Sequence, residues 1–169
     1  MPRPIAGTYP AYFDNYISLV QAASATEAIG QYGNEVVQAF RNIPAEKADF
    51  SYAEGKWTLK EMLQHIIDTE RIFAYRAVSI ARKETIGLPG FDENFYAENS
   101  KANTRYWSDL LEEFSAVRKS TDLLLLSFDE EQLNRQGITN SNPTTVNSVA
   151  FVIYGHILHH LNIIQQRYI

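Results

Sequence analysis

The sequence contains no cysteine, and this absence removes several kinds of chemistry at once. Disulfide bonds, thiolate-bound metals and a cysteine nucleophile all require that residue. Long apolar runs are missing too: no window reaches the roughly 18 apolar residues that a membrane span needs, and the first residues lack the apolar core of a signal peptide. We therefore expect a cytoplasmic protein in which any reacting thiol belongs to a bound molecule.

Positive charge is also scarce. The 169 residues include 15 Lys and Arg against 20 Asp and Glu, which gives a formal net charge of −5. A negative field repels nucleic-acid phosphates and anionic lipid surfaces, so we expect neither as a partner. Hydrophobic residues at 45% and charged residues at 21% are typical of a globular protein, and the length suits one domain over residues 1–169.

Apolar residues recur at three- and four-residue spacing, which predicts helices rather than strands. Capping patterns at Ser24 and Thr58, each followed by glutamate three positions later, mark two helix starts. Long connections separate the main helices, and a little β structure in residues 84–99 is neither required nor excluded. The fold class that follows is all-α, a four-helix bundle with long connections. We expect helices over residues 11–20, 24–43, 58–82, 107–127 and 146–169.

Three of the four histidines fall in "YGHILHHLNII", residues 154–164. On a helical projection His156 and His160 lie in the middle of the apolar stripe, while His159 lies at its edge. Side chains four residues apart share a helix face, so two imidazoles there can bind one cation. Burying them without partners would cost a few kcal/mol, about what unsatisfied polar groups cost in a core. The pair therefore points to a metal.

A third ligand is needed, and His65 is the remaining histidine. It lies at the rim of the apolar stripe on its helix, which fits a ligand in a solvent-accessible cleft and also fits an ordinary surface histidine. The zinc-protease pattern His-Glu-x-x-His is absent, and its built-in general base is absent with it. Glu61 and Asp68 serve either as helix-cap and surface residues or as supports for a ligand.

Two further groups of residues have a structural and a functional interpretation. Arg71 and Arg76 form surface salt bridges with Asp68, Glu70 or Asp92, or else bind an acidic substrate group; we favour the salt bridges. Aromatic side chains in a bundle are usually core, yet some could line a pocket near the histidine of the second helix. The candidates are Tyr52, Trp57, Tyr75, Phe91 and Tyr96.

Two segments carry a family resemblance. "KWTLKEMLQHIIDTERIFAYRAVSIARKETIGLPGFDENFYA", residues 56–97, resembles the DinB-like family of metal-binding four-helix bundles, and "YGHILHHLNIIQQRY" resembles its C-terminal helix. The resemblance implies a metal, zinc or nickel before other divalent ions, held by His65, His156 and His160. It implies a packing or supporting role for His159. Homodimers are frequent among such relatives.

The resemblance says less about the reaction. Relatives include transferases that join low-molecular-weight thiols to electrophiles, a thiol-dependent isomerase, and proteins called metal-dependent hydrolases without a known substrate. We therefore expect a small-molecule substrate and a metal that activates a thiol or a water. The alternative is a non-catalytic metal-binding or stress-response module in which the metal holds two helices together.

Overall fold

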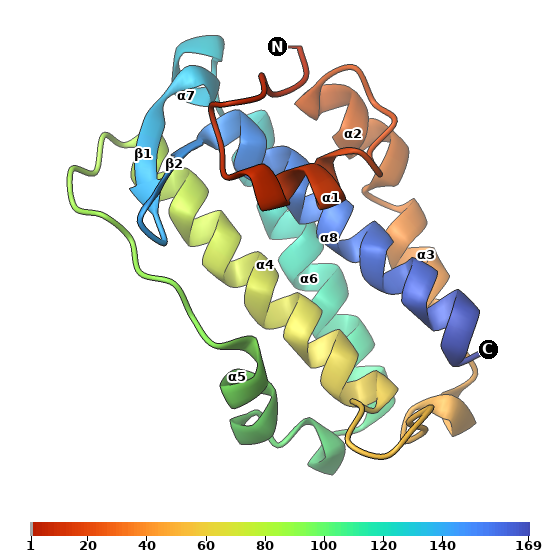
Figure 1. The fold of residues 1–169 in the computed structure, drawn as a ribbon. Coiled ribbons are helices and arrows are strands. Elements are labelled where there is room, and N and C mark those ends of the chain that lie inside the picture. The colour runs from red at the N-terminus through yellow and green to blue at the C-terminus, as the bar shows by residue number, and fades with distance from the viewer. Residues whose placement is uncertain (1) are drawn as a thin grey trace.

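The structure is a computed structural model that describes residues 2–169. Helices make up most of it, with a two-stranded hairpin at one end (Figure 1). Long helical units pack side by side, and one of them is divided in two. Their bounds are α2 (Ala25–Tyr32) with α3 (Glu35–Arg41), α4 (Leu59–Ala81), α6 (Trp107–Leu126) and α8 (Val146–Arg167). The predicted four-helix bundle is confirmed.

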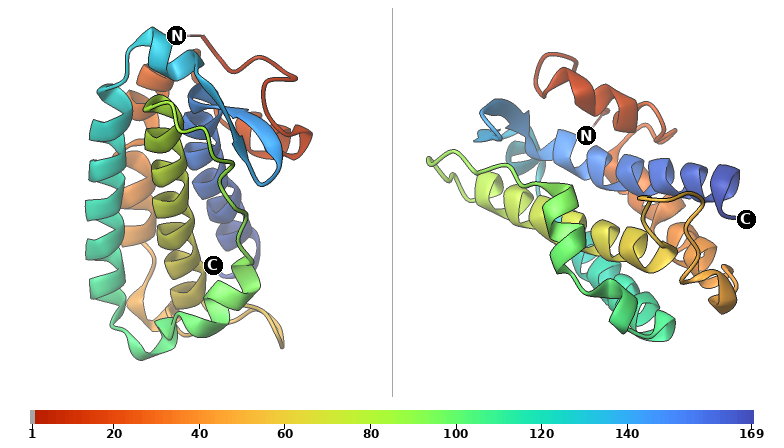
Figure 2. Two further views of the ribbon diagram at one scale, coloured as in Figure 1. Left: turned by 90° about the vertical axis from the view of Figure 1, so that its left-hand side faces the viewer. Right: turned by 60° about the horizontal axis from the view of Figure 1, so that its bottom comes forward.

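The direction of the helices explains the longest connection. α4 and α6 run the same way, whereas α8 and the α2–α3 pair run the opposite way (Figures 1 and 2). After α4 the chain must therefore return along the bundle before α6 can begin. Residues 82–106 make this return and contain α5 (Glu93–Asn99) and the 3-10 turn η3 (Ala102–Thr104).

α4 begins where the capping pattern predicted. The Thr58 hydroxyl accepts a hydrogen bond from the Glu61 amide at 3.2 Å, and the Glu61 carboxylate accepts one from the Thr58 amide at 2.7 Å. Such reciprocal capping satisfies two otherwise unpaired amides and is worth about 1 kcal/mol. Because α4 carries His65, a fixed start also fixes where that side chain points.

The helix expected over residues 24–43 is interrupted. Ser24 caps α2 as predicted, by accepting from the Glu27 amide at 3.1 Å, but the helix stops before Gly33 and resumes as α3. A Cβ at Gly33 would lie 2.8 Å from the Asp122 carboxylate of α6. The low helix propensity of glycine favours the break, and the missing Cβ permits this close approach.

The second connection contains the hairpin that the sequence did not reveal. Residues Gln136–Thr139 (β1) pair antiparallel with Asn142–Thr145 (β2), after the short helix α7 (Glu130–Asn134). Asn140 and Ser141 form the turn with positive φ of 47° and 62°. A two-residue turn of this kind is usually marked by glycine, which is absent here. The β structure considered for residues 84–99 is limited to an isolated bridge between Leu88 and Thr139.

The N-terminal segment packs across α8. It forms the 3-10 turn η1 (Ala11–Phe13) and α1 (Asp14–Ile17), and a further 3-10 turn, η2 (Ala45–Lys47), precedes α4. α1 comes so close to α8 that a Cβ at Gly155 would lie 2.2 Å from the Tyr16 carbonyl oxygen. Aromatic and aliphatic side chains of η1, α3, α4, α6 and α8 fill the core, among them Phe13, Phe40, Leu63, Ile66, Phe114 and Phe151.

No helix within residues 2–169 is both long enough and apolar enough to cross a lipid bilayer.

Candidate metal centre

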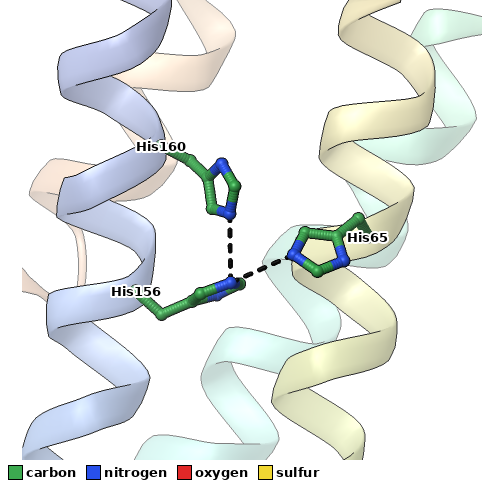
Figure 3. Close-up of side chains that lie close together, drawn as sticks. All are labelled: His65, His156 and His160. Carbon is green, nitrogen blue, oxygen red and sulfur yellow. Dashed lines mark hydrogen bonds between the residues drawn. The ribbon is translucent and has the colours of Figure 1, made fainter. Parts of the chain in front are cut away.

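Three histidines from two helices meet in the space between α4 and α8 (Figure 3). His65 Nε2 lies 3.1 Å from His156 Nε2, and His160 Nε2 lies 3.0 Å from the same atom. Ring nitrogens of all three residues lie within 4.8 Å of one another. The pair on α8 and the single histidine on α4 therefore form the group that the sequence suggested.

These distances fit a shared cation. Zinc binds imidazole nitrogen at about 2.0–2.1 Å, so two nitrogens of a tetrahedral site lie about 3.3 Å apart. His156 Nε2 has either one proton or one lone pair to present, yet it meets two nitrogens at once. A cation among the three rings would satisfy three lone pairs together, which direct hydrogen bonds between the rings cannot do.

Burial keeps the three imidazoles neutral. Desolvation lowers the pKa of His65 to about 4. Desolvation also holds the pKa of His156 and of His160 well below the ordinary value, and repulsion between the charged forms of neighbouring histidines acts in the same direction. Neutral imidazole is the form that binds metals, so the site is preorganised for a cation well below pH 7.

The contacts around the rings are mostly aromatic. The Trp57 ring lies 4.8 Å from the His65 ring, and Tyr16 packs edge-on to His156 at 5.6 Å. Thr69 Oγ1 stands 3.5 Å from His65 Nδ1, at the outer limit of a hydrogen bond, and His160 Nδ1 is buried without a partner. The rings are thus held in place chiefly by packing.

His65 is more buried than its place on the helix suggested. It is 8% exposed, where the sequence had indicated a rim position. Trp57 precedes α4 and covers the ring, and residues of the N-terminal segment line the cavity beside it. Neither contact is visible in the periodicity of α4. His159 stays outside the cluster, half-buried, with its ring 5.5 Å from Tyr16.

The cluster forms part of the wall of a cavity of about 440 Å³. Of the aromatic residues considered from the sequence, Trp57 and Phe91 line it, whereas Tyr52, Tyr75 and Tyr96 do not. Residues from the N-terminal segment line it as well, and sequence reasoning missed them because only tertiary packing brings them there. These are Tyr12, Phe13 and Tyr16.

Glu61 and Asp68 do not contact the cluster through any hydrogen bond formed within the described chain. Glu61 serves the helix cap, and Asp68 accepts a hydrogen bond from Gln64 at 2.9 Å. Both residues therefore act within α4 and its surroundings. Neither supports a ring nitrogen of the three histidines.

The two arginines of α4 behave differently from each other. Arg71 forms an ion pair with Glu113 of α6 at 2.5 Å and a longer one with Asp68 at 3.9 Å. Arg76 forms none with any acidic residue among residues 2–169; it lines the cavity and donates to the Pro89 carbonyl at 2.8 Å. The salt bridge expected for Arg76 was therefore wrong.

The fold and the cluster together define a class of protein: a four-helix bundle with a candidate metal site of three buried histidines that face a cavity. The family profile of the DinB superfamily matches residues 30–164, and the chain belongs to that superfamily. Among solved structures it is similar to YfiT from Bacillus subtilis, described as a probable metal-dependent hydrolase with an unusual four-helix bundle topology. The TM-score is 0.72 at 19% identity, covering 97% of this chain and 90% of YfiT. No curated protein matches the sequence.

Proposed function

We propose that His65, His156 and His160 bind a divalent metal ion, zinc or nickel, and that the protein uses it to activate a small thiol or a water molecule. The observation that carries this proposal is the convergence of three neutral ring nitrogens on the wall of an open cavity. When bound there, a divalent cation would act as a Lewis acid, lowering the pKa of a water or a thiol toward neutrality.

The chain's own residues support a site with room for a substrate. Three imidazoles leave a four-coordinate cation with one position to fill, and the described residues offer no further histidine or carboxylate within the cluster. Trp57 and Tyr16 pack on the ligand rings and limit water around them. These features favour a reaction site over a closed structural site.

The nucleophile has to come from outside the chain. The sequence contains no cysteine, and Glu93 is the one carboxylate among the described residues that line the cavity. Burial and, to a lesser degree, the charge of Glu93 raise the pKa of the Tyr16 hydroxyl, so this hydroxyl stays protonated and can donate a hydrogen bond to a substrate. Low-molecular-weight thiol transfer and hydrolysis both fit this set of groups.

Cobalt(II) provides the test because it accepts the same geometry as zinc and its visible spectrum reports coordination and sulfur ligation. The cobalt-loaded protein is titrated with a small thiol. We expect an intense sulfur-to-metal band, which must arise from the added thiol since the chain has none of its own. His160→Ala should abolish the band, and the matched variant His159→Ala should keep it.

The outcomes separate the candidate functions. An unchanged cobalt spectrum at millimolar thiol would remove the thiol-transferase proposal. If the same spectrum also showed a closed four-coordinate site without water, the hydrolase proposal would be rejected as well. The metal would then serve to join α4 to α8. A thiol band together with metal-dependent transfer to a model electrophile would establish the enzyme.

A further inference from the structure

A buried arginine without a counter-ion lies in the same cavity as the histidines. Arg76 is 4% exposed, its Nε has no hydrogen-bond partner, and its hydrogen bond goes to the neutral Pro89 carbonyl. Arg118, at 1% exposed, shows the usual arrangement: its guanidinium pairs with Glu70 at 2.8 Å. Buried charges are normally paired, because an uncompensated one is costly to desolvate.

Arg76 occupies the same face of α4 as His65. Thr69 and Phe73 lie between them, and all four residues line the cavity. Eleven residues of α-helix rise about 16 Å. Helical side chains lean toward the helix N-terminus, and the Arg76 guanidinium carbon lies 5.3 Å from the centre of the Phe73 ring. Because the His65 side chain leans the same way, the two groups stay about three helical turns apart along one wall of the cavity.

The surface between the two ends is partly apolar, with Phe73 beside the hydroxyl-bearing Thr69. The Phe73 ring packs edge-on against Phe13 at 6.1 Å, and both rings line the cavity. Arg76 is the one Lys or Arg among the described lining residues, and Glu93 is the one carboxylate. A molecule that fits has a reactive group at the histidines, an apolar middle and a negative group at Arg76.

We propose that Arg76 binds a carboxylate at the end of the substrate remote from the reacting atom. Within the described residues the guanidinium donates one hydrogen bond, from Nη2 to Pro89, so its remaining N–H groups can donate to a carboxylate in the cavity. One arginine balances one carboxylate charge. The inference rests on the proposed function for the position of the reacting atom, and it adds the substrate class: amphipathic carboxylic acids, thiols among them.

A purely structural role for Arg76 is the competing explanation. Its hydrogen bond to Pro89 ties α4 to the return segment, residues 82–106, and this contact alone could account for an arginine here. A test must therefore measure recognition of charge rather than stability. Metal-free protein is suitable, because a carboxylate without a thiol then reports on Arg76 and not on the histidines.

Calorimetric titration of the metal-free protein with octanoate and with octanamide makes this measurement. The two ligands share length and apolar surface and differ in charge. Hydrogen bonds to a charged group contribute about 1.5–3 kcal/mol, so octanoate should bind about 10- to 100-fold more tightly than octanamide. Arg76→Gln should remove this preference and leave octanamide affinity unchanged. Arg71→Gln, on the same helix but paired with Glu113, is the matched control and should keep it.

Arg76→Lys guards against misfolding, because it keeps the charge and can still donate to Pro89; it should retain a reduced preference for octanoate. Equal affinity of the unmodified protein for octanoate and octanamide would overturn the proposal. So would an equal loss of both affinities in Arg76→Gln. Metal content of Arg76→Gln should match the unmodified protein, so failure of carboxylate binding and failure of the metal site give different results.

Discussion

Replacing Gly155 with alanine should destabilise the protein by forcing α1 away from α8. The new Cβ would lie 2.2 Å from the Tyr16 carbonyl oxygen and 2.5 Å from the carbon of the same group. Both are backbone atoms, so no side-chain rotation relieves the clash. Ordinary contact begins near 3.4 Å, and α1 must therefore move by about 1 Å.

Overpacking of this kind typically costs 1–3 kcal/mol. Alanine also favours a helix over glycine by about 1 kcal/mol, which offsets part of the cost. We expect a net loss of about 0–2 kcal/mol in the free energy of unfolding, equivalent to at most about 8 °C in melting temperature for a domain of this size. Metal content should persist, since all three histidines belong to α4 and α8 and not to α1.

Gly30→Ala is the matched control, because a Cβ there meets nothing within 4 Å. Gly30 lies inside α2, so this change should leave stability the same or raise it by up to about 1 kcal/mol. Urea unfolding followed by circular dichroism measures both variants. If Gly155→Ala were as stable as Gly30→Ala, the close approach of α1 to α8 would be refuted, and with it the position of Tyr16 beside His156.

Three further predictions follow from the buried charges and the surface. Metal-free protein should lose stability as pH falls from about 6.5 to 4, because histidines of the unfolded chain bind protons that buried His65, His156 and His160 do not. The lowered pKa of His65 alone accounts for a loss of about 3 kcal/mol in the free energy of unfolding across this range. Urea unfolding midpoints measured against pH check this loss. Arg118→Met should cost about 3–5 kcal/mol by leaving Glu70 buried and unpaired, whereas a smaller loss in urea unfolding would contradict that pairing. We also propose a homodimer, and light scattering at micromolar concentration that gave the mass of one chain would reject it.

The helices and the histidine cluster were predictable because their signals are local. The Thr58 capping box sets where α4 begins, and the apolar stripe of α8 turns His156 and His160 inward and His159 to its edge. Once the bundle is assumed, His65 is the one histidine left to complete the group. Periodicity and capping therefore carried the fold class and the inward pair on α8, whereas the place of His65 in the cluster was implied by the family resemblance.

The walls of the cavity were not predictable in the same way. Tyr16 reaches the histidines because α1 crosses α8 at Gly155, a contact between residues far apart in the sequence. Arg76 looked like a surface residue, since nothing local shows that the return segment contacts it or that it forms no ion pair within residues 2–169. The hairpin was missed because its turn, Asn140–Ser141, lacks the glycine that usually marks one.

Metal analysis of four purified single variants tests the central claim most directly. His65→Ala, His156→Ala and His160→Ala should each lose most of the bound zinc or nickel at pH 7, because each removes one of three converging ring nitrogens. His159→Ala should keep about one metal ion per chain, since His159 lies outside the cluster. Equal metal content in all four variants, or selective loss in His159→Ala, would contradict a site built from His65, His156 and His160.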